Sequence, residues 1–269
     1  IYYLPLAVNT DRLSSQLNSQ TREEKDRFSA DISFVGSMYH KNSYDDIKDK
    51  LPPYLRGYFD AAMLAQLNIY GDNIIDELLT VDILKQLSEF VDFRQDKRAF
   101  SDIRLVFEST FLGFKLANIE RVKTLNLLAK KNKVALYTDE QDASLINVDF
   151  KGTVDYMDDM PKVFNNSSIN LNMTIRNIRT GIPLRVWDIL GAGGFLLTNY
   201  QIELTDYFKN EESIVYYEDM YDCCKKAEYY LLHEDKRRQI AAKGHELVSK
   251  KHSYINRVEY ILDVIGKMS

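Results

Sequence analysis

The residues best suited to bind a ligand lie within residues 172–194, where polar side chains and a glycine precede a predicted helix. Thr180 and Gly181 come just ahead of Pro183, which we expect at the first helical position because proline fits there. Backbone N–H groups at the start of a helix are free, and the helix dipole favours an anion beside them. Gly181 carries no side chain and lets a ligand approach the backbone. The segment therefore indicates a phosphate-binding loop.

Charged side chains accompany this loop. Three arginines would add positive charge to it: Arg176, Arg179 and Arg185. The predicted helix also contains Asp188, three residues after Arg185, so both side chains share one helix face. The spacing alone favours a surface ion pair worth a few tenths of a kcal/mol, and arginines also occur on solvated faces. The residues alone therefore leave phosphate binding as one of two interpretations.

The elements that must position these residues alternate along the chain. Short apolar runs predict buried strands at residues 31–37, 133–138, 148–154, 168–173, 193–198 and 213–217. Helical patterns lie between them, the longest being residues 107–131 and the tail 218–268. This alternation predicts an α/β fold, a Rossmann-like parallel sheet with helices on both faces. Ligands bind beyond the carboxyl ends of such strands, so one crevice should collect the loops after Ser37, Thr138, Val154 and Met173.

The chain divides into a core and flanking segments. Residues 1–30 turn from apolar to polar and are interpreted as a linker from a missing N-terminal domain. Residues 31–253 form the Rossmann-like domain, and residues 44–100 are a helical insertion of two or three amphipathic helices. Residues 254–269 are expected to be a C-terminal crossing helix. Because the chain starts at Ile1 without a signal-peptide pattern, we expect it to begin within a longer gene product.

Composition argues against several functions. The 35 basic and 40 acidic residues give a net charge of -5, which argues against a nucleic-acid partner. No apolar run approaches the roughly 18 residues of a transmembrane segment. The two cysteines, Cys223 and Cys224, are adjacent, so they form neither a disulfide framework nor a four-ligand zinc site, and they suit the cytosol. Asp-x-Asp, Walker and dinucleotide motifs are missing, and no metal cofactor is expected.

Residues 170–208, NLNMTIRNIRTGIPLRVWDILGAGGFLLTNYQIELTDYF, resemble the CgeB-like (spore-maturation protein) glycosyltransferases, bacterial enzymes of the GT-B fold. Weaker similarities are DISFVGS, LPPYLRGYFDAAMLAQLNIYG and NIERVKTLNLLAKKNKVALYT. GT-B enzymes have two Rossmann-like domains facing a cleft, and this chain looks like the C-terminal one, which binds the nucleotide sugar. Residues 1–13 resemble the exit from the N-terminal, acceptor-binding domain. Residues 254–265 resemble the helix that crosses back to it.

The resemblance implies roles for individual residues. Asp188 falls at the second acid of a Glu-x7-Glu motif, which holds the ribose hydroxyls of the donor, and the first acid is replaced by Thr180. Thr180, Gly181 and Ile182 resemble the loop whose backbone meets the sugar or diphosphate, and Arg185 lies nearby. Gly36 and Ser37 resemble the loop under the diphosphate. The purine or pyrimidine base of the nucleotide would lie near Thr138, Val154 and Tyr156.

Together these features predict the donor-binding domain of a metal-independent, cytoplasmic glycosyltransferase of the hexosyltransferase type. The resemblance implies a nucleotide-diphosphate sugar as the donor and the N-terminal acceptor-binding domain of the same gene product as the partner. The isolated chain would be incomplete as an enzyme. The main alternative is a non-catalytic GT-B-like module in surface or spore-layer assembly, which the departure at Thr180 favours. A sugar-phosphate epimerase would need a self-contained two-domain chain, and the length of 269 residues argues against it.

Overall fold

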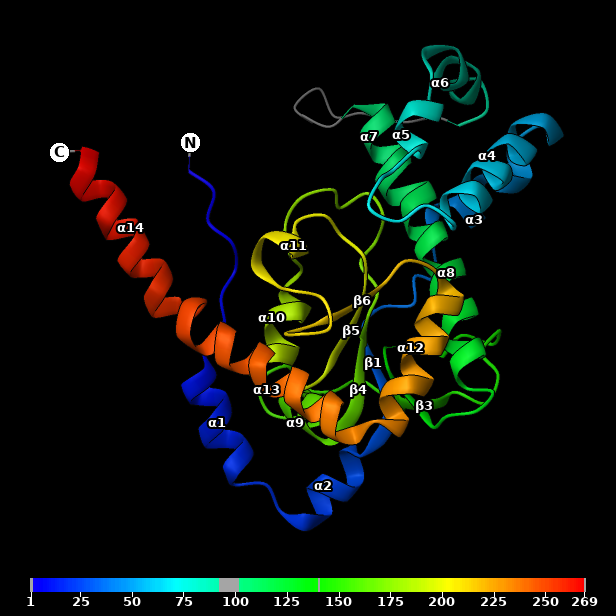
Figure 1. Ribbon diagram of the computed structural model, residues 1–269. Coiled ribbons are helices and arrows are strands. Elements are labelled where there is room, and N and C mark those ends of the chain that lie inside the picture. The colour runs from blue at the N-terminus through cyan, green and yellow to red at the C-terminus, as the bar shows by residue number, and fades with distance from the viewer. Residues whose placement is uncertain (1, 92–101, 140, 269) are drawn as a thin grey trace.

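The computed structural model describes residues 2–91, 102–139 and 141–268. Its centre is an all-parallel, six-stranded sheet in the order β3-β2-β1-β4-β5-β6 (Figure 1). The strands are β1 Ala30–Val35, β2 Val134–Tyr137, β3 Asp149–Gly152, β4 Ser167–Asn172, β5 Leu196–Asn199 and β6 Val215–Tyr217. The strand order reverses between β1 and β4, so the sheet is doubly wound. This confirms the predicted fold class. Each strand coincides with a predicted run; no strand extends more than one residue beyond its run, and some are up to three residues shorter at one end.

Apolar side chains cover both faces of the sheet. The covering helices include α8 Phe114–Leu128, α9 Met160–Asn166, α10 Leu184–Gly191 and α12 Met220–Leu232. Leu136 and Leu197 belong to the core cluster that includes side chains of α8 and α12. Their neighbours Ala135 and Leu196 face the opposite way, into the cluster with α9 and α10. Strands buried on both faces have nearly continuous apolar sequences, which is why these runs could be recognised.

The insertion between β1 and α8 is helical, as predicted, but more finely divided and longer. Its described elements up to residue 91 are α3 Ser43–Ile47, the 3₁₀ turn η1 Lys48–Lys50, α4 Pro53–Gln66, α5 Ile75–Leu78 and α6 Val81–Ser88. Residues 92–100 of the predicted insertion lie outside the described residues. The chain then forms α7 Ile103–Val106 and the π-helical segment η2 Phe107–Gly113, which leads directly into α8. Leu55 and Phe59 pack in one cluster with Leu112 and Leu116, so the insertion shares its core with the start of α8.

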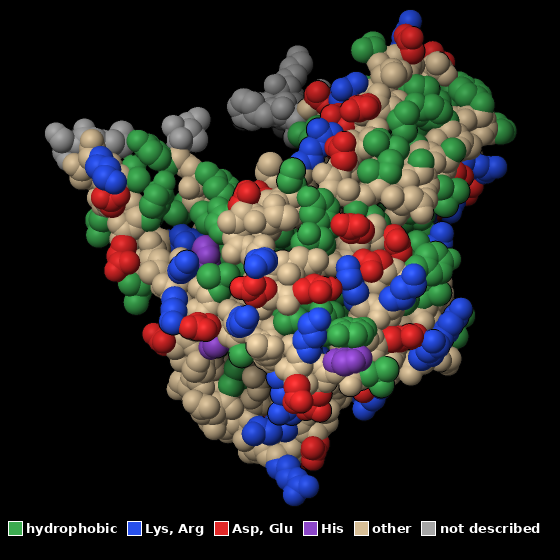
Figure 2. All heavy atoms as spheres, viewed as in Figure 1, with side chains coloured by type: hydrophobic (Ala, Val, Ile, Leu, Met, Phe, Trp, Pro, Cys, Tyr) green, Lys and Arg blue, Asp and Glu red, His purple; other side chains and the backbone are tan. Residues whose placement is uncertain are grey.

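The C-terminal tail is helical, as predicted. After the short α11 Leu204–Tyr207 come α12, α13 Glu234–Lys251 and α14 Tyr254–Met268. α14 leaves the body of the domain on the same side as the N-terminus (Figure 1), and Figure 2 shows hydrophobic side chains along it. Exposed apolar residues there include Ile255, Val258, Leu262 and Ile265. No helix among the described residues is both long and apolar enough to cross a membrane.

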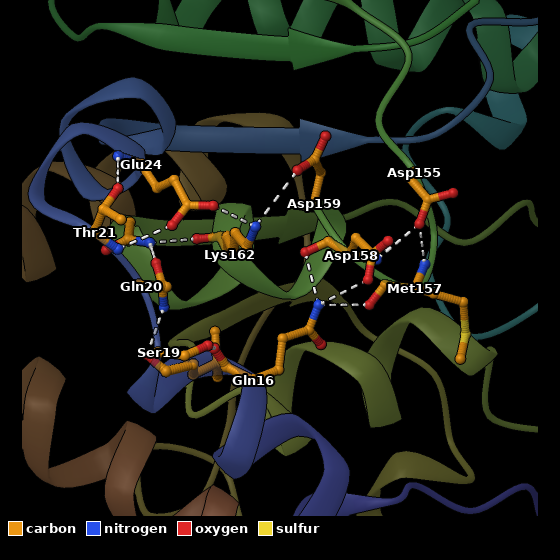
Figure 3. A network of polar contacts seen from close by, with 12 residues as sticks. Gln16, Ser19, Gln20, Thr21, Glu24, Asp155, Met157, Asp158, Asp159 and Lys162 are labelled. Atoms are coloured by element: carbon orange, nitrogen blue, oxygen red, sulfur yellow. Dashed lines mark hydrogen bonds and ion pairs between the residues drawn. The ribbon is translucent and has the colours of Figure 1, made fainter.

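Residues 1–30, interpreted from the sequence as a linker, contain two helices that the sequence did not predict. They form α1 Thr10–Asn18 and α2 Arg22–Phe28, the latter with a capping box between Thr21 and Glu24. Figure 3 shows how they are attached: Gln16 donates to the carbonyl oxygen of Met157 at 2.9 Å, and Lys162 donates to Glu24 at 2.6 Å. The polar composition concealed these helices because only a few apolar residues, such as Leu13, reach the core. A connection to a further domain stays a prediction.

Candidate functional site

A cavity of about 280 Å³ lies at the point where the strand order reverses. Its walls come from the loop after β1, the loop after β4 and the start of α10, and include Gly36, Ser37, Thr174, Pro183 and Arg185. In open α/β sheets, ligands bind at this position, outside the carboxyl ends of the strands. The fold therefore brings three of the predicted site residues, Gly36, Ser37 and Arg185, to one cavity.

Arg121 of α8 also lines this cavity and was missed by the sequence analysis. Its guanidinium donates to the carbonyl oxygen of Ser37 and, at 2.6 Å, to that of Met173. It thereby joins the loops after β1 and β4. Burial lowers the pKa of Arg121, but a guanidinium stays protonated in proteins. A lone arginine inside a long helical pattern carries no sequence signal for this role.

The start of α10 faces the same cavity. Pro183 is the N-cap and Leu184 the first helical residue, so proline lies one position earlier than predicted. The N–H groups of the first helical turn have no acceptor within the helix, apart from Val186, whose N–H donates to the carbonyl oxygen of Pro183 at 3.0 Å. The positive end of the helix dipole lies here as well. An anion in the cavity would thus meet backbone donors and the Arg185 side chain.

Asp188 lies one turn further along α10, beside Arg185 and Tyr156. Arg185 Nη1 is 3.5 Å from Asp188 Oδ2, and the Tyr156 hydroxyl donates to Oδ1 at 3.1 Å. The Asp188 side chain is only 13% exposed, and this burial raises its pKa, while Arg185 opposes the rise. Burial, together with Asp188, raises the pKa of Tyr156 to about 12. The ion pair expected from the spacing is therefore present, but it is partly buried instead of lying on a solvated face.

The loop before α10 has a distinct conformation. Gly181 has a φ of +92°, a region that favours glycine, and the position where a side chain would begin has no atom within 4 Å. Its N–H donates to the carboxylate of Glu203. Ile182 is buried in the core, and the exposed Thr180 lines a separate cavity of about 520 Å³ against the insertion. Thr180 thus lies outside the walls of the cavity that Arg185 lines.

The three arginines of this region are dispersed. Arg179 reaches the insertion, where it pairs with Asp76 at 3.1 Å and donates to the carbonyl oxygen of Asn73 at 3.2 Å. Arg176 is buried and pairs with Glu120 at 2.8 Å. Of these three arginines, Arg185 alone lines the cavity at the start of α10. The structure therefore does not assemble the arginine cluster that their closeness in sequence suggested.

The residues predicted to lie near the nucleotide base follow the carboxyl ends of β2 and β3. Thr138 is buried and donates through its backbone N–H to the carbonyl oxygen of Gly152 at 3.0 Å. Val154 packs on the core, and Tyr156 reaches Asp188. Among the described residues, no group of three or more His, Cys, Asp or Glu side chains is placed to hold a metal ion.

A family model described as glycosyl transferase-like matches residues 118–263, more than half of the chain. The chain belongs to this glycosyltransferase family. The match covers Arg121 and Asp188 and ends within α14. No curated protein sequence matches the chain. The CgeB-like subfamily stays a prediction.

Several solved glycosyltransferase structures are similar to this chain at low sequence identity. A glycosyltransferase from Rickettsia africae has a TM-score of 0.48 and 11% identity, covering 96% of this chain and 55% of that one. Anabaena HepE in complex with UDP-glucose has a TM-score of 0.45 and 11% identity, covering 54% and 44%. TarM has a TM-score of 0.44 and 14% identity, covering 53% and 31%. The chain spans between about a third and just over half of the length of these structures.

Proposed function

We propose that this chain is the nucleotide-sugar-binding domain of a metal-independent GT-B glycosyltransferase of the hexosyltransferase type. The observation that carries the proposal is the cavity between β1 and β4, whose walls include two arginines and the start of α10. Membership of a glycosyltransferase family supports the same activity. The CgeB-like subfamily, a bacterial source and a cytoplasmic location are parts of the proposal.

The diphosphate of the donor would lie between the Gly36–Ser37 loop and the start of α10. Arg185 and Arg121 would supply positive charge, and the free N–H groups of α10 would donate hydrogen bonds. With the diphosphate there, these groups would face the negative charge that develops as it leaves, and would stabilise the transition state without a bound cation. This arrangement supports metal independence.

The nucleoside would extend toward Asp188. A carboxylate can accept two hydroxyl hydrogen bonds, which suits the ribose. In the free protein, Asp188 Oδ1 accepts from the Tyr156 hydroxyl and Asp188 Oδ2 lies beside Arg185. A ribose hydroxyl would therefore replace the Tyr156 hydroxyl as the donor to Oδ1. Thr138, Val154 and Tyr156 would lie near the base. Thr180, Gly181 and Ile182 would lie near the sugar, and Arg179 would contribute only through its contact with the insertion.

An N-terminal acceptor-binding domain is the partner that we propose. The exposed apolar side chains of α14 and the exposed Tyr2, Leu4 and Leu6 support this, because an apolar surface of this kind is typical of a protein interface. The catalytic base would belong to that domain. We therefore expect this chain to bind nucleotide sugars weakly and to transfer little or no sugar alone.

The proposal is tested by calorimetric titration of the chain with UDP, GDP and their hexose conjugates. One nucleotide should bind saturably, and Asp188→Ala and Arg185→Ala should each weaken it by about tenfold, or 1.4 kcal/mol. Arg238→Ala is the matched control, because Arg238 pairs with Glu234 on α13, outside the walls of the cavity. EDTA should leave the affinity unchanged.

No binding by a folded sample would contradict the donor-site proposal. It would favour the second candidate, a non-catalytic module in surface or spore-layer assembly. The observation on that side is Thr180, which stands where the resemblance expects an acid and lies outside the walls of the cavity. Loss of binding on adding EDTA would contradict metal independence alone.

A further inference from the structure

The carboxylate of Glu203 connects two segments that are far apart in the sequence. Glu203 is the N-cap residue of α11. Its Oε2 accepts the backbone N–H of Gly181, and its Oε1 accepts the hydroxyl of Tyr3. Burial and Glu203 raise the pKa of Tyr3, so this hydroxyl keeps its proton at neutral pH. One side chain thus holds both the loop before α10 and the N-terminal segment.

The bond to Gly181 is the main polar attachment of that loop. Within the described part of the chain, no other hydrogen bond ties the backbone of residues 180–182 to a different element, and the carbonyl oxygen of Pro183 accepts only from Val186 of the helix that follows. Ile182 supplies an apolar anchor by its burial in the core. Gly181 itself has a positive φ and open space where a side chain would begin, so its conformation depends strongly on this bond.

The N-terminal segment is in turn attached to α14. Arg257 of α14 donates to the carbonyl oxygens of Pro5 and Leu6, each at 2.9 Å. Val8 donates its N–H to the carbonyl oxygen of His252, just before α14, at 3.1 Å. A displacement of α14 or of residues 2–6 would therefore reach Glu203 through Tyr3.

We propose that Glu203 is a positioning residue for the loop at Gly181, and that the Tyr3–Glu203–Gly181 contact couples the N-terminal segment to the candidate donor site. The functional part of this inference rests on the proposed donor binding. Loss of the Tyr3 or Glu203 contact loosens the loop and weakens donor binding, although neither side chain lines the cavity at the start of α10.

The test combines amide hydrogen exchange of residues 179–184 with titration of the same samples by UDP-glucose and GDP-mannose. Glu203→Ala should speed exchange at Gly181 and raise the Kd by about fivefold to tenfold, the effect of losing one hydrogen bond. Glu203→Gln keeps an acceptor oxygen, so its exchange rate at Gly181 and its Kd should be close to those of the wild type. Tyr3→Phe should raise the exchange rate and the Kd by less than Glu203→Ala does. Asp206→Ala, which removes the same charge from exposed α11 surface, is the control and should match the wild type.

The outcomes separate the two proposals. Faster exchange in Glu203→Ala without nucleotide binding in any variant would support the positioning contact and contradict the donor site. Nucleotide binding with wild-type exchange and affinity in Glu203→Ala would contradict the positioning role and leave the donor site standing. A Tyr3→Phe variant identical to the wild type in both measurements would refute the coupling to the N-terminal segment.

Discussion

A buried ion pair attaches the loop after β4 to α8 and to the insertion, and breaking it should destabilise the chain. Glu120 Oε1 accepts from Arg176 at 2.8 Å and from the Tyr70 hydroxyl at 3.1 Å. The side chains of Arg176 and Glu120 are only 4% and 2% exposed. Glu120→Ala would leave the guanidinium buried without its carboxylate, next to the Tyr70 ring, whose centroid lies 3.5 Å away.

The expected cost follows from this geometry. Removing one partner of a buried pair costs about 3–5 kcal/mol, because the remaining charge is uncompensated. The Tyr70 ring still stabilises the cation, so the lower end, about 3 kcal/mol, is expected. For a chain of this size, that lowers the Tm by roughly 6 °C. Urea unfolding followed by circular dichroism, together with a thermal scan, measures both quantities.

Two variants make the measurement decisive. Glu228→Ala removes a carboxylate that is 44% exposed and paired with Lys131, and it should cost less than about 1 kcal/mol. Replacing both buried partners, Glu120→Leu with Arg176→Met, should recover most of the loss because no buried charge remains. The reasoning is wrong if Glu120→Ala costs no more than Glu228→Ala.

Two further predictions concern stability. Burial and Arg257 lower the pKa of His252 to about 4 in the folded protein. Between pH 6.5 and 4 the unfolded state therefore binds more protons than the folded state, and the free energy of unfolding should fall by about 2 kcal/mol from pH 7 to 5. Urea unfolding at both pH values measures this loss, and an equal loss in His252→Gln would refute the assignment. A Cβ at position 244 would lie 2.4 Å from the carbonyl oxygen of Ser213, so Gly244→Ala should cost about 1–3 kcal/mol. The control is Gly57→Ala in α4, where a Cβ would have no atom within 4 Å, so this variant should gain about 0.5–1 kcal/mol of stability. Thermal scans of both variants measure the difference, and equal Tm values for Gly244→Ala and Gly57→Ala would contradict the argument.

The strands and the position of the cavity could be predicted because both follow from local patterns. A strand buried on two faces needs consecutive apolar residues, and the loops after parallel strands meet at one edge of the sheet. Of the four loops expected at one crevice, those after Ser37 and Met173 line the cavity, with Gly36, Ser37 and Arg185. Thr138 and Val154 are not among its lining residues, so that part of the prediction was wrong. The helices α1 and α2 were not predicted, since their stability depends on caps and on contacts such as that between Lys162 and Glu24.

The sequence by itself determined the order of helices and strands, the parallel sheet and the loops that face the cavity, because hydrophobic periodicity and chain connectivity dictate them. The pairing of Arg185 with Asp188, three residues apart, also followed from local spacing. Only the tertiary structure decided which charged groups from distant segments meet. Arg176 and Arg179, close neighbours in sequence, bond to different parts of the fold, whereas Arg121 reaches Ser37 from 84 residues away. The contact of Glu203 with Gly181 has the same origin. Long charged side chains pair with whatever acceptor packing places beside them, and that neighbour is set by how distant segments fold together.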